Sequence, residues 1–138
     1  MAAGYSKRTL VDKLGIKPDA RVIALSAPPS YLSLLGKLPA GATLHSRLSG
    51  PSAFIHQFAR RRADLAADFP RLARALADHG ALWVSWPKQA SGVETDLNEN
   101  VVREIGLAHG LVDVKVCAVD EVWSGLKFVR RVENRAAK

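Results

Sequence analysis

The sequence predicts an α/β fold with a mainly parallel sheet of five or six strands, helices on both faces and a C-terminal antiparallel hairpin. Short apolar runs alternate with segments of helical spacing, which is typical of parallel sheets with crossover helices. The last two strand-like runs are separated only by a turn, so we expect them to pair as a hairpin. A length of 138 residues fits a single domain spanning 1–138, and no internal repeat or low-complexity linker divides it.

The first half of the chain is expected to alternate short helices with short strands. Apolar residues at helical spacing mark the helices, and β-branched or alternating runs mark the strands. Proline and glycine turns, such as Pro28-Pro29 and Ser49-Gly50-Pro51, separate these elements. The predicted elements are helices at 6–14 and 30–38 and strands at 21–27, 42–48 and 53–59.

A long helix, a strand, a second helix and the hairpin are expected in the second half. Pro70 lies inside the long helical pattern and predicts a kink or two abutting helices. Thr95 or Asp96 is expected to cap the second helix, although the loop at 91–96 is also suited to anion binding at a helix N-terminus. The predicted elements are a helix at 62–78 that Gly80 stops, a strand at 81–87, a helix from the cap to Gly110, and two strands joined by a turn near 120–124.

Composition excludes several classes of protein. The chain has one cysteine, Cys117, which allows neither a disulfide framework nor a cysteine-rich zinc site. The N-terminus lacks the apolar stretch of a signal peptide, and no apolar run approaches the roughly 18 residues of a membrane span. A cytoplasmic protein without a membrane partner is therefore expected.

The chain is basic, with a formal net charge of +7 and a pI near 10.0. Much of the excess positive charge lies in two places. One is the run of three arginines at 60–62, and the other is the segment 130–138, which we expect to be a flexible basic tail. Such charge can attract nucleic acid, but no basic run alternates with the aromatic residues on which bases stack. Solvated charged faces are the preferred interpretation, and nucleic-acid binding has no motif in its support.

The strand at 81–87 ends in Trp86, Pro87 and Lys88, and this is the most informative place in the chain. Ligands of open α/β sheets bind beyond the carboxyl ends of the strands. There Lys88 could pair with an anion or act as a base. In the structural alternative, Trp86 and Trp123 pack as edge aromatics while Lys88 pairs with Asp120 or Glu121. The candidate ligand-binding residues at this edge are Ser26, Pro28, Trp86, Lys88, Ser91, Asp120, Glu121 and Trp123.

The sequence offers little support for a metal site or an activated nucleophile. His45 and His56 are expected on neighbouring strands, but no further ligand accompanies them, so no metal site is predicted. His79 and His109 are expected in the last turns of helices, where a cation suits the helix dipole. Cys117 lies between apolar neighbours and is expected in the core.

Three blocks, VSWPK, SGVETDL and VDVKVCAVDEVWSGLKFV, resemble a bacterial family known as domain of unknown function 3052. The likeness extends over nearly the whole chain. It implies a compact intracellular bacterial protein without an assigned reaction. More distantly, the order of elements and the final hairpin resemble the Rossmann-like fold of S-adenosylmethionine-dependent methyltransferases.

The resemblance to methyltransferases fails at the residues that would hold the cofactor. Those enzymes carry a glycine-rich turn after the first strand and an acidic residue at the end of the second. Here Pro28 and Pro29 follow the first strand and offer no backbone N–H groups, and the second strand ends in Ser46-Arg47-Leu48. S-adenosylmethionine is therefore not expected as a cofactor.

The sequence thus favours a module that binds a small molecule or a protein partner over an enzyme, and leaves enzymatic activity open. The alternative is a divergent S-adenosylmethionine-dependent transferase that uses the same edge through other contacts. Weak nucleic-acid binding through the basic patches is the third reading. The residues alone leave open which ligand is bound.

Overall fold

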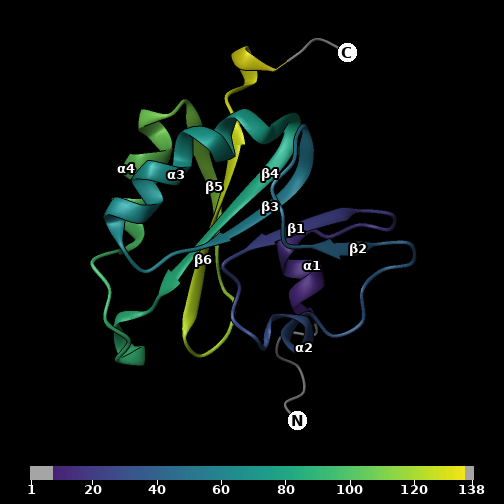
Figure 1. The fold of residues 1–138 in the computed structure, drawn as a ribbon, viewed down its shortest axis with the longest axis horizontal. Coiled ribbons are helices and arrows are strands. Elements are labelled where there is room, and N and C mark those ends of the chain that lie inside the picture. The colour runs from purple at the N-terminus through teal and green to yellow at the C-terminus, as the bar shows by residue number, and fades with distance from the viewer. Residues whose placement is uncertain (1–7, 136–138) are drawn as a thin grey trace.

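Residues 8–135 are described by a computed structural model in which one sheet lies between two layers of helices (Figure 1). The helices are α1 (Leu10–Leu14), α2 (Tyr31–Leu35), α3 (Arg62–Ala75) and α4 (Glu99–Ala108), with short 3-10 helices η1 (Gln89–Ser91) and η2 (Val132–Asn134). The strands are β1 (Arg21–Leu25), β2 (Thr43–His45), β3 (Ser52–Phe58), β4 (Leu76–Pro87), β5 (Leu111–Ala118) and β6 (Trp123–Arg130).

The six strands follow the order β2-β1-β3-β4-β6-β5. β1 to β4 are parallel, and β6 runs antiparallel between β4 and β5. The predicted fold class, a mainly parallel α/β sheet with a C-terminal antiparallel hairpin, is confirmed. No helix among residues 8–135 is long and apolar enough to cross a membrane.

Two hydrophobic cores lie on opposite faces of this sheet. Helices α1 and α2 cover one face, where Trp83 is fully buried and its indole N–H donates to the backbone oxygen of Leu14 (2.9 Å). Helices α3 and α4 cover the other face, where the rings of Phe69 and Phe128 meet edge to face. Gly106 allows α4 to pack closely there, because a Cβ at this position would collide with the Phe128 ring.

The long helix is shorter than predicted and the strand after it is longer. Helix α3 ends at Ala75 and Leu76 already belongs to β4, so the predicted stop at Gly80 and the helical position of His79 are wrong. Leu76 is buried in the same core as the helix, which is why helical spacing extended through it. Arg130 donates to the oxygens of Ala73 and Leu76 (2.7 and 2.6 Å) and so satisfies carbonyls at the helix end.

Pro70 lies within one uninterrupted helix, so the prediction of two abutting helices is wrong. Arg130, with which the expected basic tail begins, is the last residue of β6, and η2 follows it.

The two helices before β3 are also shorter than predicted. Thr9 caps α1, its hydroxyl accepting from the Asp12 amide (3.1 Å), so the helix begins four residues later than expected. The first predicted helical residues, Ser6 and Lys7, lie outside the described part of the chain. Helix α2 stops before Gly36, whose positive φ of 71° breaks the helical path.

The C-terminal hairpin turns earlier than predicted, because Trp123 is already paired with Pro87 in the sheet. β5 is the outer strand, and Val114 and Val116 are 55% and 51% exposed. The expected burial of Cys117 between apolar neighbours is therefore only partly correct. Its side chain is half-buried, and this burial raises the pKa of the thiol.

Candidate functional site

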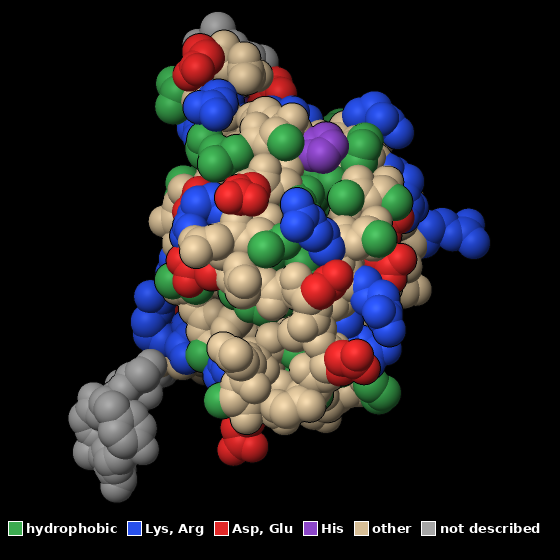
Figure 2. Space-filling view, turned by 90° about the vertical axis from the view of Figure 1, so that its left-hand side faces the viewer, with side chains coloured by type: hydrophobic (Ala, Val, Ile, Leu, Met, Phe, Trp, Pro, Cys, Tyr) green, Lys and Arg blue, Asp and Glu red, His purple; other side chains and the backbone are tan. Residues whose placement is uncertain are grey.

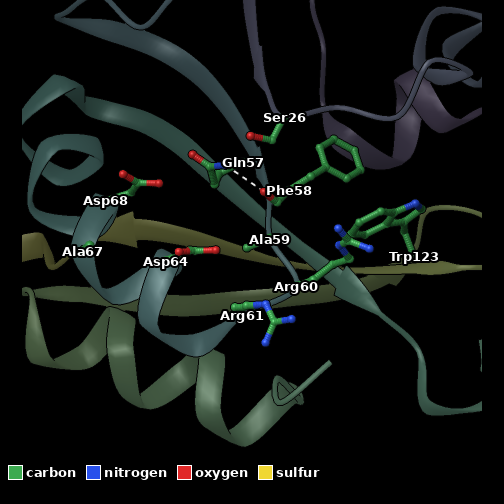
Figure 3. Close-up of a pocket in the computed structure, with 10 residues that line it drawn as sticks. All are labelled: Ser26, Gln57, Phe58, Ala59, Arg60, Arg61, Asp64, Ala67, Asp68 and Trp123. Atoms are coloured by element: carbon green, nitrogen blue, oxygen red, sulfur yellow. Dashed lines mark hydrogen bonds between the residues drawn. The ribbon is translucent and has the colours of Figure 1, made fainter. Parts of the chain in front are cut away.

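The sheet has a topological switch point between β1 and β3. After β1 the chain passes through α2 to β2 on one side, whereas β3 lies on the other side of β1 and leads through α3 to β4. The connections therefore diverge at the carboxyl ends of β1 and β3, which is where open α/β sheets bind ligands. A cavity of about 400 Å³ lies there and is called the switch-point cavity (Figure 3). Its lining includes Ser26, Gln57, Phe58, Arg60, Arg61, Asp64, Asp68 and Trp123.

The floor of the switch-point cavity is made by the strand ends themselves. Ser26 follows β1 with a left-handed φ of 57°, which ends the strand. Gln57 is 4% exposed, and its amide nitrogen donates to the backbone oxygen of Phe58 (2.8 Å). The Trp123 ring meets Phe58 edge to face, with centroids 5.0 Å apart. A polar amide and a half-exposed indole are thus both held by the sheet.

Charges of both signs line the same cavity. Arg60 and Arg61 follow β3 directly, and Asp64 and Asp68 lie one helical turn apart on α3. Figure 3 shows the two carboxylates on the side of α3 and the Arg60 guanidinium on the side of Trp123. Asp68 also pairs with the exposed Arg71 at 3.4 Å. The arrangement can accept a ligand that carries an anionic and a cationic group.

A second cavity of about 430 Å³, here the Trp86 hollow, lies between the end of β4 and the start of α4. Its lining includes Trp86, Gln89, Glu94, Thr95, Asp96 and Asn98. Trp86 packs into the core under α3 and α4, whereas Trp123 packs against the core under α1 and α2. The two indoles were predicted to lie together at one edge, but they pack on opposite faces of the sheet.

The loop before α4 holds the segment after β3. Thr95 donates to the backbone oxygen of Arg60 (2.6 Å), and a carboxylate oxygen of Asp96 accepts from the Arg62 amide (2.7 Å). The cap of α4 is Asn98, whose side chain accepts from the Val101 amide (2.9 Å). The prediction that Thr95 or Asp96 caps α4 is wrong, because these side chains anchor the start of α3 instead.

The structure divides the eight candidate residues among several places. Ser26 and Trp123 line the switch-point cavity, and Trp86 lines the Trp86 hollow. Pro28 lines a third cavity of about 310 Å³, which also touches Tyr31 and His45.

The remaining four candidates, Lys88, Ser91, Asp120 and Glu121, line none of these three cavities. Asp120 accepts from the amides of Val122 and Trp123 (both 2.8 Å) and shapes the hairpin turn. The Ser91 hydroxyl donates to the backbone oxygen of Lys88 (2.7 Å). No ion pair joins Lys88 to Asp120 or Glu121 among residues 8–135, so the structural alternative for Lys88 is wrong.

Sequence reasoning missed Gln57 and the charged residues of the switch-point cavity. The preferred interpretation of the arginines at 60–62 is a solvated charged face, although they follow the predicted strand at 53–59 directly. The rule that pointed to Lys88 after β4 applies equally to Arg60 after β3. The signal was present in the sequence.

A buried chain of polar side chains links α2, β3 and β4. The Tyr31 hydroxyl is 2.8 Å from His56 Nδ1, and His56 Nε2 is 2.8 Å from the Ser85 hydroxyl. Complete burial lowers the pKa of His56 to about 3, and burial raises the pKa of Tyr31 above its usual value. His56 is therefore neutral at physiological pH.

The expectation that His45 and His56 lie on neighbouring strands is wrong, because β1 separates β2 from β3. Within the described part of the chain, no three side chains of the metal-binding types come together.

The residues at the ends of β1 and β2 do not fit the methyltransferase grip on S-adenosylmethionine. Pro28 and Pro29 offer no amide donors in the loop after β1, and the Pro28 oxygen already accepts from the Tyr31 amide (2.9 Å). Ser46 and Arg47 follow β2 where a carboxylate would be needed for a ribose. The cofactor therefore has none of its expected partners there.

Comparison with known proteins shows the fold. A SAM-dependent methyltransferase from Aquifex aeolicus aligns with a TM-score of 0.59 at 12% identity, covering 86% of each chain. Magnesium protoporphyrin IX methyltransferase from Synechocystis PCC 6803 with bound SAH aligns with a TM-score of 0.56 at 11% identity, covering 88% of this chain and 78% of that one. The chain thus has a methyltransferase-like fold.

Comparisons of sequence assign no family. No protein-family model matches the chain, and no curated protein matches it either. Membership of the domain of unknown function 3052 family stays a prediction.

Proposed function

We propose that this protein is a small-ligand-binding module whose site is the switch-point cavity. The observation that carries the proposal is the position of charges of both signs, with an indole and a buried amide, at the one place where the chain connections diverge. The ligand is expected to be zwitterionic and to carry a flat group. Of the eight candidates from the sequence, the proposal keeps Ser26 and Trp123.

Each wall of the cavity has a distinct part in this proposal. Guanidinium groups bind carboxylates or phosphates through two parallel hydrogen bonds, which suits Arg60 and Arg61 to the anionic group. Asp64 and Asp68 would pair with the cationic group. Trp123, held edge to face by Phe58, offers ring surface to the flat part of the ligand.

The second candidate is a divergent S-adenosylmethionine-dependent transferase. Its support is the shared fold, together with a cavity lined by side chains of both charges. Against it stand the prolines after β1 and the missing acid after β2. We propose no transfer step, because the residues that would hold the cofactor are absent from those places.

Nucleic-acid binding is the third candidate and has the least support. On the face shown in Figure 2, Lys and Arg side chains alternate with Asp and Glu among the described residues. A surface that tracks a phosphate backbone would instead be continuously positive.

The test is the melting temperature of the purified protein against a panel of metabolites. The panel includes aromatic amino acids, their single-charge analogues, S-adenosylmethionine and S-adenosylhomocysteine. A ligand that binds the folded state raises its stability by about 2.7 kcal/mol at one hundred times its dissociation constant. We expect a shift with zwitterions that the single-charge analogues do not produce.

Two variants locate the shift. Asp64→Asn should abolish it, whereas Arg21→Ala should leave it intact, because Arg21 is exposed at the amino end of β1, away from the cavity. A shift confined to S-adenosylmethionine and S-adenosylhomocysteine would favour the transferase. No shift with any ligand would count against both candidates.

A further inference from the structure

We propose that the Trp86 hollow is a second binding site, separate from the switch-point cavity, for a hydroxylated organic amine such as an amino sugar or amino alcohol. The hollow measures about 430 Å³, which is within the range of small-molecule sites, roughly 300–1,000 Å³. It lies between the end of β4 and the start of α4 rather than at the switch point, and it shares no lining residue with the switch-point cavity.

The charge of the lining selects for a cation. The chain as a whole carries +7, yet the hollow is lined by two carboxylates, Glu94 and Asp96, and by no lysine or arginine. Glu94 is exposed and makes no ion pair among residues 8–135. One oxygen of Asp96 accepts from the Arg62 amide (2.7 Å), which leaves its other oxygen for a ligand. An ammonium group would be bound between these carboxylates.

The indole N–H of Trp86 adds a second requirement, because the ligand must also supply a hydrogen-bond acceptor. Trp86 is 5% exposed, and no hydrogen-bond partner for its indole N–H is found among residues 8–135. Trp83, three residues earlier on the same strand, instead donates to the oxygen of Leu14 (2.9 Å). Arg130 Nε is the only described side-chain nitrogen or oxygen that is sealed from solvent without a hydrogen bond. The Trp86 N–H is therefore not sealed from solvent, and Trp86 is one of the residues that line this hollow.

These two features together define the ligand class. A simple alkylamine would satisfy the carboxylates but leave the indole N–H without an acceptor, which costs binding energy in a buried wall. A neutral sugar would supply a hydroxyl acceptor but no cation. A ligand with both an ammonium group and hydroxyl groups matches the carboxylates and the N–H, and its hydroxyls can also meet the side-chain amides of Gln89 and Asn98.

The rim of the hollow is fixed before any ligand arrives. Thr95 donates to the Arg60 oxygen and accepts from the Leu97 amide (2.6 and 3.1 Å). Asn98 accepts from the Val101 amide (2.9 Å) as the cap of α4. A loop held at these points loses little freedom on binding, so it can retain a small ligand.

The test is a titration of the isotope-labelled protein with glucosamine, followed by the indole N–H signals of its three tryptophans. Trp86→Phe identifies the Trp86 signal. Glucose, which lacks the ammonium group, and cyclohexylamine, which lacks the hydroxyls, are the matched probes, at a pH where the amines are protonated. We expect glucosamine to move the Trp86 signal and to leave that of Trp83 in place. Each matched probe should bind at least about fivefold more weakly, the equivalent of about 1 kcal/mol.

Glu94→Gln removes the charge while keeping the shape, and should weaken glucosamine binding about fivefold, as expected for a partly exposed ion pair. Glu104→Gln, on an exposed position of α4 outside the hollow, is the control and should change nothing. The proposal is overturned if glucosamine leaves the Trp86 signal unmoved, if glucose or cyclohexylamine binds equally well, or if the two glutamate variants behave alike. None of these outcomes depends on the switch-point cavity.

Discussion

The loop after β1 and the loop after β3 end neighbouring parallel strands but offer a ligand very different groups. After β1 the chain runs through Pro28 and Pro29, which carry no amide hydrogen. After β3 it runs through Arg60 and Arg61 into α3, whose carboxylates face the same cavity. The fold is methyltransferase-like, but the charged side chains that line the cavity follow β3 rather than β1. A shared fold therefore does not imply that the same strand end holds the ligand.

The largest expected change in the free energy of unfolding comes from the packing at the end of β3, compared with the exposed loop after β1. Phe58 ends β3 with 2% exposure and contacts the rings of Tyr31, His56 and Trp123. Phe58→Ala should lower the free energy of unfolding by about 3–5 kcal/mol, because it leaves a cavity among these rings. Pro29→Ala, in the exposed loop after β1, should lower it by less than about 1 kcal/mol. Urea unfolding measures both, and equal losses would mean that the two loops are supported alike.

The buried histidine of β3, His56, predicts a loss of stability in acid. The pKa of His56 is lowered to about 3 by burial, whereas in the unfolded chain it takes its ordinary value of about 6.5. Between these values the unfolded chain binds a proton that the folded chain does not. Stability should therefore fall as the pH falls from about 6.5 toward 3, by at most about 1.4 kcal/mol per pH unit from this residue.

Urea unfolding at several pH values checks this window, with His56→Gln as the comparison. The wild type should lose stability more steeply than the variant between pH 6.5 and 4. Parallel pH dependences would mean that His56 is protonated in the folded state.

A smaller loss of stability is expected from Asp96, which supports the start of α3, whereas Asn98 caps α4. Asp96→Ala should cost about 1 kcal/mol, because it removes the acceptor of the Arg62 amide at the start of α3. Hydrogen exchange of the Arg62 amide should become faster, while that of Val101, which Asn98 caps, should not change. Glu94→Ala is the control on the same loop. Faster exchange at Val101 instead would restore Asp96 to the capping role that the sequence suggested.

The sequence predicted the edge of the sheet correctly but not the face. Parallel strands bring their carboxyl ends to one edge, so Ser26, Trp86 and Trp123 could be placed together from the order of elements. The register pairs Pro87 with Trp123 and Trp86 with Ser124. Paired residues on adjacent strands point to the same face of the sheet, whereas successive residues along a strand point to opposite faces. Trp86 and Trp123 therefore point to opposite faces. One residue of register decides this, and no local pattern encodes it.

The end of α3 was unpredictable for a different reason. Leu72 and Leu76 are both buried in one core, although the first is helical and the second begins a strand. The buried positions follow helical spacing as far as Leu76. Periodicity therefore cannot show where the backbone changes from helix to strand. The backbone carbonyls at this boundary accept hydrogen bonds from Arg130, which lies more than fifty residues later in the chain.

Mapping of backbone amide shifts shows whether the ligand binds at the end of β3. The labelled protein is titrated with the zwitterion that raises the melting temperature most. We expect the perturbed amides to cluster at 57–68 and at Trp123. Perturbations confined to 26–31 and 45–48, the ends of β1 and β2, would contradict it and return the site to the place where a methyltransferase would hold its cofactor.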